Sequence, residues 1–384
     1  MKNKAELLAK AGAYLAEIKS LAEELGTEGS RTEVLSTKEP GITGKPYIIM
    51  EVCGTHTVAI AKNALRDFLP DNIRLISGPG CPVCVTDGSD IDRYLYLAAK
   101  PNVITTTFGD MIRVPGTEKT LQVLKAEGAD VRVVYSTQDA LEVARKNPEK
   151  EVVFLGVGFE TTTPTVAVSI EQAKREGLPN FSVLSMHKVV PPVLRLLAED
   201  KDLTVNAFLD PGHVCTIIGT KPLAFIAEDY GLPEVVTGFD AADILEGIAM
   251  LLRQRAEGRS EIEIQYKQVV KPEGNPHAQK IVERVFEPAD ALWRGMGMIP
   301  ASGLGIREEY GLWDAARKFN LPVFQSPEIP GCRCGDVLKG LIYPAECPLF
   351  GRRCTPMQPV GPCMVSSEGS CAAYYRYGKR NGKD

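Results

Sequence analysis

The sequence contains no apolar run that approaches the ~18 residues of a membrane-spanning helix, so no bilayer-crossing segment is expected. It also lacks an excess of positive charge, and the formal net charge of -5 argues against nucleic acid as a partner. There is no P-loop, and no GxGxxG motif opens a helix after a strand, so little supports nucleotide binding. The first residues run into an amphipathic pattern instead of the apolar core of a signal peptide, and we therefore expect a cytoplasmic protein.

Cysteine, by contrast, is plentiful, with ten residues in the chain. Without an expected export signal, ten cysteines do not suggest a disulfide framework, and in a reducing cytosol they indicate metal binding or redox chemistry. Their distribution is uneven, because six of the ten lie within the last 53 residues. Two separate thiol sites are therefore expected. The scattered group is Cys53, Cys81, Cys84 and Cys215, and the crowded group is Cys332, Cys334, Cys347, Cys354, Cys363 and Cys371.

Short apolar runs alternate with helical patterns between residues 46 and 240, which is typical of parallel sheets covered by helices on both faces. The length of this region fits two such units better than one. The sequence therefore predicts an α/β protein with two Rossmann-like parallel-sheet domains, residues 46–137 and 138–240, and size alone sets this division. The expected strands are 47–52, 73–76, 103–107, 131–135, 152–157, 181–184, 205–209 and 235–237, and the expected helices include 58–68, 90–99, 118–127, 138–145 and 164–175.

The two ends of the chain read differently from the middle. Residues 4–26 carry apolar side chains at helical spacing and end in glycine, which predicts an amphipathic helix, followed by a linker at 27–45. Residues 241–384 are expected to form a loop-rich, helical domain that packs with the N-terminal helix. Its expected elements are helices at 241–257 and 276–286, an edge strand at 261–270, a glycine-rich passage at 293–305 and a tail from 325 with too few apolar residues for its own core.

Most of the expected strands end in a polar or glycine-rich motif. In open α/β sheets the ligand site lies beyond the carboxyl ends of the strands, so these motifs are predicted to line a cleft between the two units. The motifs are CGTHT at 53–57, GPGCPVC at 78–84, FGD at 108–110, GFETT at 158–162, MHK at 186–188 and DPGH at 210–213.

Cys81 and Cys84 form a CxxC pair on a turn that glycine and proline make rigid. Such a pair either cycles between dithiol and disulfide or binds a soft metal. Together with Cys53 it offers three thiolates that would bind zinc or iron, and His56 is a candidate proton donor, orienting group or further ligand. A helix that starts near Thr57 is expected to point its positive end at Cys53 and to lower the pKa of that thiol.

Two further residues at strand ends are candidates for acid–base chemistry. Glu160 offers a carboxylate beside three threonine hydroxyls, although the same segment also suits an N-terminal helix cap before Pro164. His213 is presented by a Pro-Gly turn and is a candidate general acid or base, with a structural role as the alternative.

The tail cysteines form the second thiol site. Four thiolates from a loop-rich segment suit an iron–sulfur cluster or a structural zinc ion, and a cluster would supply the stability that the tail lacks. The wide, uneven gaps of 14, 6 and 16 residues lack the paired CxxC motifs of a zinc ribbon and favour the cluster. Cys334 competes with Cys332 on spacing, and Cys363 is a spare thiol, a redox partner or an alternative ligand. The four predicted ligands are Cys332, Cys347, Cys354 and Cys371.

Five motifs of this chain resemble, in order and spacing, those of the HypD family of hydrogenase maturation proteins: CGTHT, GPGCPVC, GFETT, PGHV at 211–214 and the tail cysteines. The resemblance implies two α/β domains and a [4Fe-4S] domain that also includes the N-terminal helices. It implies that the Fe(CN)2CO group of nickel–iron hydrogenase is assembled on the protein. It also implies two partners: HypC, a small protein that helps to hold the iron, and HypE, which brings cyanide as a thiocyanate on its C-terminal cysteine.

By the same resemblance, Cys53 binds Fe(II), the substrate, and shares it with the N-terminal cysteine of HypC. The Cys81–Cys84 dithiol is expected to be oxidised as cyanide is transferred, and the cluster to reduce it again. His56 and His213 would hydrogen-bond or protonate incoming groups, whereas Cys215 matches no functional position. Whether such a redox-active scaffold counts as an enzyme stays open.

Two other classes of protein compete with this interpretation. A free-standing thiol–disulfide oxidoreductase would use the CxxC pair on generic disulfides, but it leaves Cys53 and the GFETT motif without a role. A zinc-stabilised binding module would be colourless and carry stoichiometric zinc. Iron and acid-labile sulfide in the purified protein would distinguish the scaffold from both.

Overall fold

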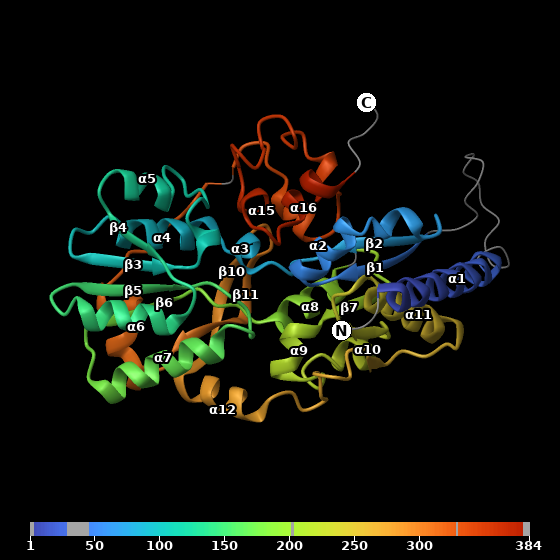
Figure 1. The fold of residues 1–384 in the computed structure, drawn as a ribbon, viewed down its shortest axis with the longest axis horizontal. Helices are drawn as coiled ribbons and strands as arrows, with labels where there is room; N and C mark the ends of the chain where they lie inside the picture. Colours follow the sequence, from blue (N-terminus) through green and yellow to red (C-terminus); the bar gives the residue numbers. More distant parts are fainter. Residues whose placement is uncertain (1–3, 29–45, 201–202, 328, 379–384) are drawn as a thin grey trace.

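The computed structural model of the protein describes residues 4–28, 46–200, 203–327 and 329–378, and two parallel sheets form its centre (Figure 1). Sheet I has the order β2-β1-β7-β8-β9 and sheet II the order β4-β3-β5-β6, with all neighbouring strands parallel. The predicted α/β class with two Rossmann-like sheets is thus confirmed. Sheet I contains β1 (Tyr47–Glu51), β2 (Ile73–Ser77), β7 (Ala207–Pro211), β8 (Glu234–Thr237) and β9 (Ile262–Ile264), and sheet II contains β3 (Val103–Thr107), β4 (Asp130–Val133), β5 (Glu151–Gly156) and β6 (Phe181–Ser185).

The first strands of the chain do not form one sheet and the later strands the other, as the division based on size predicted. β1 and β2 begin sheet I, the next four strands form sheet II, and β7 to β9 return to complete sheet I. The predicted division between residues 137 and 138 therefore falls inside sheet II, between β4 and β5. The partners of a parallel strand are set by long-range crossovers, which a local apolar pattern does not reveal.

The helices expected between the strands are present. The segment predicted as a helix at 58–68 is divided, because α2 ends at Lys62 and a 3-10 turn, η2 (Leu65–Phe68), completes it. The helices up to β8 are α1 (Lys4–Glu28), α2 (Gly54–Lys62), α3 (Pro82–Val85), α4 (Gly88–Ala98), α5 (Leu121–Ala126), α6 (Thr137–Lys146), α7 (Thr163–Glu176), α8 (Val190–Glu199), α9 (Gly212–Ile218) and α10 (Phe225–Tyr230), with the 3-10 turn η3 (Gly109–Met111). Those after β8 are α11 (Ala241–Ala256), α12 (Pro276–Val285), α13 (Ala315–Lys318), α14 (Cys334–Leu338), α15 (Pro362–Val365) and α16 (Ser370–Tyr377), with η4 (Glu308–Trp313) and η5 (Pro344–Glu346).

Neighbouring residues of each strand face opposite sides of the sheet, and the cores follow this alternation. In β1, Ile49 packs into a core with α1 and α11, whereas Met50 packs into the core that contains the CxxC segment. In β5, Phe154 packs with α6 and α7, and Leu155 faces the same inner core as Met50. Both sheets therefore turn one face toward the CxxC segment.

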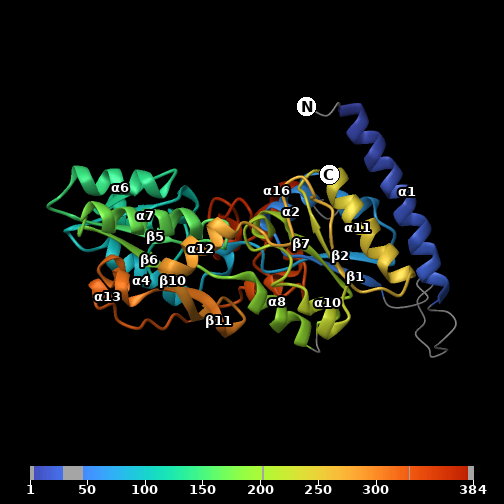
Figure 2. The same ribbon diagram turned by 90° about the horizontal axis from the view of Figure 1, so that it is seen from below.

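The N-terminal helix lies at the edge of the molecule, along α11 (Figure 2). Glu17 and Arg253 form an ion pair between the two helices. α1 continues two residues beyond the predicted end at Gly26, and residues 29–45 of the predicted linker lie outside the described residues. α11 does belong to the segment 241–384 that α1 was expected to pack with, but it covers sheet I and not the cysteine-rich tail.

The passage at 293–305 is a β-hairpin and not the glycine-rich connection that the sequence predicted. β10 (Phe286–Trp293) pairs with β11 (Gly297–Ile306) in antiparallel register. Gly295 and Gly297 have positive φ angles of 72° and 78°, which the tight turn between the strands requires. The glycines that suggested a loop thus form the turn and parts of a strand.

The cysteine-rich tail sits over the junction of the two sheets, where Figure 1 shows α15 and α16 beside α3 and α2. Within the described ranges, none of the helices combines the length and the apolar character needed to cross a bilayer. The tail thus adds a third layer at the place where the ends of the strands meet.

Candidate functional site

A cleft of about 290 Å³ lies where the two sheets and the tail meet. The order of sheet I reverses between β1 and β7, and that of sheet II between β3 and β5, which are the positions where open α/β sheets bind ligands. The loops after all four of these strands line the cleft, as the sequence predicted, and so does the CxxC loop. The predicted MHK motif at 186–188, after β6, does not line this cleft. Among the lining residues are Cys53 after β1, His213 after β7, Asp110 after β3, Thr161 and Thr162 after β5, and Ser366 and Glu368 from the tail.

The Cys53 loop and the CxxC loop touch through their backbones. The amide of Gly54 donates a 2.9 Å hydrogen bond to the carbonyl of Gly80, the residue before Cys81. A Cβ atom on Gly80 would lie 2.2 Å from the nitrogen of Cys53, so glycine is required for this approach. The first predicted thiol site is therefore a single structural unit.

Cys53 occupies the N-cap position of α2 and is 8% exposed. The predicted helix is present, but the predicted lowering of the thiol pKa is wrong. Burial raises the pKa of Cys53 to about 12, and the negative charges of Glu368 and Glu51 add to the shift. Hydrogen bonds from the first turn of α2 offset it only in part. A cation that replaced the thiol proton would balance the buried negative charge.

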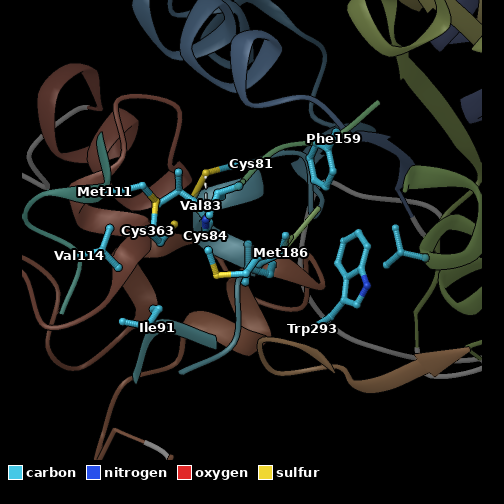
Figure 3. Packing of buried hydrophobic residues seen from close by; sticks show 14 of the residues in the cluster. Cys81, Val83, Cys84, Ile91, Met111, Val114, Phe159, Met186, Trp293 and Cys363 are labelled. Carbon is cyan, nitrogen blue, oxygen red and sulfur yellow. Dashed lines mark hydrogen bonds between the residues drawn. A yellow bond between two sulfur atoms is a disulfide. The ribbon is translucent and has the colours of Figure 1, made fainter. Parts of the chain in front are cut away.

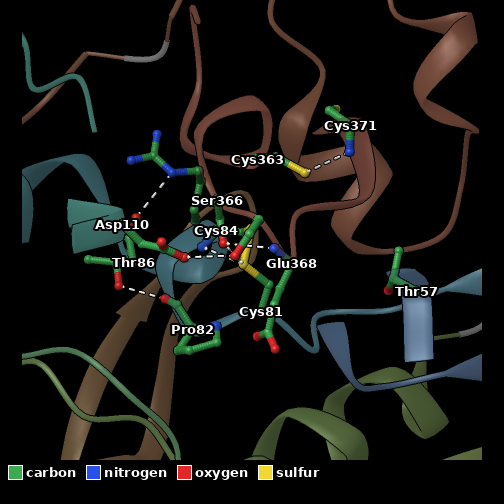
Figure 4. The surroundings of a disulfide bond; sticks show 12 residues. Thr57, Cys81, Pro82, Cys84, Thr86, Asp110, Cys363, Ser366, Glu368 and Cys371 are labelled. Carbon is green, nitrogen blue, oxygen red and sulfur yellow. Dashed lines mark hydrogen bonds between the residues drawn. A yellow bond between two sulfur atoms is a disulfide. The ribbon is translucent and has the colours of Figure 1, made fainter. Parts of the chain in front are cut away.

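Cys81 and Cys84 form a disulfide at the N-terminus of α3 (Figure 4). Cys81 is 4% exposed and Cys84 is fully buried. The hydroxyl of Ser366, which lines the cleft, lies 3.5 Å from Sγ of Cys81. Cys81 is therefore the sulfur nearer to the cleft.

The predicted metal site of Cys53, Cys81 and Cys84 gains no support from this arrangement. Two of its sulfurs are bonded to each other, so neither is a thiolate in this state. In the parts of the chain that the structure describes, no three His, Cys, Asp or Glu side chains are grouped as ligands of a single metal ion. The geometry favours the redox alternative for the CxxC pair.

His56 does not line the cleft. Its Nε2 lies 2.9 Å from the carbonyl oxygen of Gly238 and 3.0 Å from Oγ1 of Thr237, at the end of β8. Since a carbonyl only accepts, Nε2 carries the proton, and burial lowers the pKa of the ring to about 4. Of the roles predicted for His56, the geometry fits an orienting group and not a ligand or a proton donor in the cleft.

His213 lines the cleft as predicted. Its ring stacks on Phe239 at a centroid distance of 3.9 Å, and His56 packs on the same phenyl ring at 4.8 Å. Partial burial lowers the pKa of His213, while the charge of Glu368 opposes this shift. At neutral pH His213 is therefore a neutral ring that can donate or accept one hydrogen bond in the cleft.

Glu160, predicted as a catalytic carboxylate, points away from the cleft. Its Oε1 accepts a 2.8 Å hydrogen bond from the amide of Val190, the first residue of α8. Burial raises the pKa of this carboxyl group to about 7. Of the two predicted roles, helix capping therefore fits the structure better than catalysis. The capped helix is α8, however, and not α7, which follows Glu160 in sequence.

The tail supplies two cleft residues that the motifs did not reveal, Ser366 and Glu368. Oγ1 of Thr55, two residues after Cys53, donates a 2.8 Å hydrogen bond to Oε1 of Glu368. A Cβ atom on Gly54 would lie 2.6 Å from Cβ of Glu368, so the two loops are closely packed. The polar run SSEGS at 366–370, between two cysteines, was the signal that could have found them.

The four predicted tail ligands line one apolar pocket together with Cys334. Hydrogen bonds join Cys334 to Cys332 and to Cys371, so the thiols contact one another. Cys363 lies fully buried behind them, and its Sγ accepts a 3.2 Å hydrogen bond from the amide of Cys371. The other lining residues are mostly apolar, with Arg333 as the charged exception: Val337, Leu349, Phe350, Gly361, Met364 and Arg333.

This donor set fits an iron–sulfur cluster. Soft thiolates in a mostly apolar pocket are the ligands that such clusters take. The residues that would hold it are those predicted, Cys332, Cys347, Cys354 and Cys371. Cys334 lines the pocket equally, so the geometry does not separate it from Cys332.

The two thiol sites are neighbours. Cys81, Cys84 and Cys363 belong to one buried core, and Figure 3 shows Cys363 close to the CxxC pair. α15, which carries Cys363, packs against α3, which carries Cys84. Trp293 of the hairpin stacks on Phe159 at the side of this core (Figure 3).

Comparison with known proteins agrees with this geometry. A family model described as "HypD: Hydrogenase formation hypA family" matches residues 31–378. The chain is 47% identical over 375 residues to the hydrogenase maturation factor HypD of Rhodobacter capsulatus, with 96% of each chain covered. It is 47% identical over 334 residues to HypD of Escherichia coli K12, with 87% of this chain and 90% of the relative covered.

An archaeal relative extends the comparison. The chain is 45% identical over 329 residues to a putative hydrogenase expression/formation protein of Methanocaldococcus jannaschii, with 86% of this chain and 91% of the relative covered. The match over nearly the whole length, at this level of identity, confirms the resemblance that the motifs suggested. The chain belongs to the HypD family, the family of hydrogenase maturation factors.

Proposed function

We propose that this protein is the scaffold on which the Fe(CN)2CO group of nickel–iron hydrogenase is assembled, together with HypC and with cyanide delivered by HypE. The observation that carries the proposal is the backbone contact between the Cys53 loop and the CxxC loop at the cleft. It holds a free thiol beside a cysteine pair that forms a disulfide, next to the cleft where the switch points of the two sheets meet. A metal-binding thiol and a two-electron donor are the two functions that the assembly needs.

Cys53 is the residue proposed to bind Fe(II), which is the substrate. Binding replaces the thiol proton by the metal, so one proton leaves for each iron bound. The high pKa of Cys53 means that the free thiol is neutral, and that iron and not water is the species that stabilises the thiolate. The open side of the cleft leaves room for the second thiolate that HypC is proposed to supply.

The CxxC pair is proposed to supply the electrons that release cyanide. The Cys81 thiolate attacks the sulfur of the HypE thiocyanate, a mixed disulfide forms, and cyanide leaves to the iron. Cys84 then attacks Cys81, which gives the disulfide and frees the HypE thiol. In sum, one thiocyanate and two thiols give one cyanide, one carrier thiol, one disulfide and one proton. The disulfide of the structure corresponds to the state after transfer.

The tail is proposed to serve the CxxC pair. An iron–sulfur cluster bound there would pass electrons one at a time from an external one-electron donor, and two electrons with two protons would turn the disulfide into a new dithiol. Ser366, beside Cys81, and Cys363, in the same core, belong to the segment that links the two thiol sites. His213 is proposed to donate a hydrogen bond to groups that enter the cleft.

Infrared spectroscopy tests the proposal. Wild-type protein purified without oxygen together with HypC should show bands of iron-bound CN and CO. A Cys53→Ala protein should bind HypC but lack these bands, and a Cys215→Ala protein should keep them, because Cys215 is buried away from the cleft lining. Bands of normal intensity in the Cys53 variant would show that Cys53 is not the residue that binds the iron.

The rival oxidoreductase function can be tested with the same protein. A free-standing oxidoreductase has to present a thiol to protein disulfides, and here both sulfurs are buried. We expect reduction of insulin disulfides to be close to the uncatalysed rate. Rapid reduction would favour the rival.

A further inference from the structure

The segment between Cys363 and Cys371 places one buried hydroxyl on the CxxC pair. Ser366 is 1% exposed, and its Oγ lies 3.5 Å from Sγ of Cys81 (Figure 4). Because a disulfide sulfur carries no proton, the hydroxyl is the donor in this contact. The same oxygen accepts a 3.2 Å hydrogen bond from the amide of Glu368, which leaves the hydroxyl proton free for the sulfur.

The backbone of the tail holds Ser366 in this place. Its amide donates a 3.0 Å hydrogen bond to the carbonyl of Pro362, and its carbonyl accepts a 3.1 Å hydrogen bond from the amide of Gly369. Together with the bond from Glu368, these contacts fix both the position of the residue and the direction of its hydroxyl. The contact with Cys81 is therefore built into the fold of the tail.

The next two side chains reach the two walls of the cleft. Oγ of Ser367 donates a 3.1 Å hydrogen bond to Oδ2 of Asp110, in the loop after β3 of sheet II. Glu368 accepts the 2.8 Å hydrogen bond from Thr55, beside β1 of sheet I. Of three consecutive residues, one thus binds each sheet and Ser366 binds the CxxC pair between them.

Two donors converge on Sγ of Cys81. Besides the Ser366 hydroxyl, the amide of Cys84 lies 3.2 Å from this sulfur. A thiolate is a much stronger acceptor than a disulfide sulfur, so both hydrogen bonds gain strength when the pair is reduced. Cys84 is fully buried in an apolar core, which disfavours a thiolate at that position. The negative charge of the reduced pair therefore belongs on Cys81.

We propose that Ser366 is a positioning residue that holds Sγ of Cys81 toward the cleft and makes it, and not Sγ of Cys84, the attacking thiolate of the CxxC pair. The thiolate forms a bond to the sulfur of the incoming thiocyanate, and the electron pair of the broken S–C bond leaves with cyanide. The proton of Ser366 stays on its oxygen throughout. The substrate in this inference rests on the proposed function, whereas the contact with Cys81 does not.

Alkylation of the reduced pair tests the inference without iron, cyanide or a partner. The full chain is reduced with dithiothreitol, freed of it without oxygen, and treated with iodoacetamide at a series of pH values. Peptide mass spectrometry then gives the rates at Cys81 and Cys84 separately, and Cys81 of the wild type should react first. In Ser366→Ala the rate at Cys81 near neutral pH should fall about fivefold, because a hydrogen bond to the thiolate is lost. The pH profile of that rate should move to higher pH.

Three further variants serve as controls. Ser366→Thr keeps the hydroxyl and should restore the wild-type profile. Ser367→Ala removes an exposed hydroxyl that bonds to Asp110 and not to the pair, so the profile at Cys81 should stay unchanged. If Ser366→Ala does not fold, Ser366→Val takes its place, since it has the shape of the threonine variant without the hydroxyl.

Each outcome decides the inference. An unchanged profile at Cys81 in the Ala or Val variant overturns it, as does an equal shift in Ser367→Ala or in Ser366→Thr. Faster reaction at Cys84 than at Cys81 in the wild type overturns it too. A shifted profile in Ser366→Ala, combined with normal hydrogenase maturation in cells that carry Cys81→Ser, would support the role of Ser366 and contradict the cyanide transfer of the proposed function.

Discussion

The cleft and the cysteine pocket both contain thiols, yet they differ in almost every other property. The cleft is open, is lined by residues such as Glu368, His213 and Thr161, and holds one free cysteine. The pocket is lined mostly by apolar side chains and holds five cysteines. The loops of the cleft follow strands of regular sheets, whereas the pocket is built by short helices and turns.

This difference separates a transient occupant from a resident one. Polar groups at an open site can bind and release a substrate without leaving a costly unpaired group behind, because water takes its place. An apolar pocket of thiols has no such replacement and is stabilised by a group that stays. The cleft therefore suits cargo that leaves with a partner, and the pocket suits a cofactor of the protein itself.

The largest effect is expected from the pocket. If the pocket holds the proposed cluster, Cys371→Ala should remove nearly all iron and sulfide from the anaerobically reconstituted protein, because one of the four proposed ligands is lost. Cys53→Ala, in the cleft, should retain both at wild-type levels. Iron and sulfide analysis with absorption spectra measures the difference. Equal loss of iron and sulfide in the two variants would contradict the distinction between a transient site in the cleft and a resident site in the pocket.

The next effect concerns the shape of the cleft. Gly80→Ala should destabilise the protein by about 3 kcal/mol, since the new Cβ would lie 2.2 Å from the nitrogen of Cys53. Thermal unfolding measures the loss, and the infrared bands of the iron group should vanish with it. Gly109→Ala is a matched control after β3, where the nearest atom to a new Cβ is 3.8 Å away. A Gly80→Ala protein as stable as this control would contradict the close contact.

A smaller effect, which depends on pH, tests the position of Glu160. Its folded pKa of about 7 lies above the ordinary value of about 4.5, so the folded protein binds the extra proton between these values. Wild-type stability should therefore fall as the pH rises through this window. Glu160→Gln avoids the loss, so its advantage in unfolding free energy, measured by denaturant titration, should grow from pH 5 to pH 8 up to about 3 kcal/mol.

The same variant shows whether Glu160 belongs to the cleft. Because the carboxyl group faces α8, Glu160→Gln should still mature hydrogenase in cells. Thr161→Gln, one residue on and in the cleft lining, should impair maturation. Loss of maturation only in the Glu160 variant would mean that this carboxylate takes part in the reaction at the cleft.

The smallest effect measures the tie between the tail and the Cys53 loop. Thr55→Val and Glu368→Gln each remove one partner of the 2.8 Å hydrogen bond. A double-mutant cycle of unfolding free energies should give a coupling of about 1 kcal/mol. A coupling near zero would mean that the two regions are independent at this point.

Much of the fold could be predicted from the sequence, because buried parallel strands leave a strong local signal. The runs at 103–107 and 152–157 coincide closely with β3 and β5. The order of the strands could not be predicted, since pairing between β1 and β7 joins segments more than 150 residues apart. The hairpin at 286–306 was missed because its glycines, Gly295 and Gly297, are typical of loops as well as of tight turns.

The site was predictable where position along a strand decides it, and not where the direction of a side chain does. Cys53 and His213 follow neighbouring strands at a switch point, and both line the cleft. His56 and Glu160 lie close to strand ends too, but their side chains turn toward β8 and α8. Glu368 comes from the tail, and only the tertiary fold brings it to Cys53.

The return of the chain to sheet I has a consequence for synthesis on the ribosome. β2 ends at Ser77 and β7 begins at Ala207, 130 residues later. At roughly 5–20 residues per second, β1 would wait on the order of ten seconds for its second neighbour, while sheet II can already close on itself. During that time the unpaired edge of β1 is open to other chains, which makes early binding of a chaperone to the nascent N-terminal half advantageous.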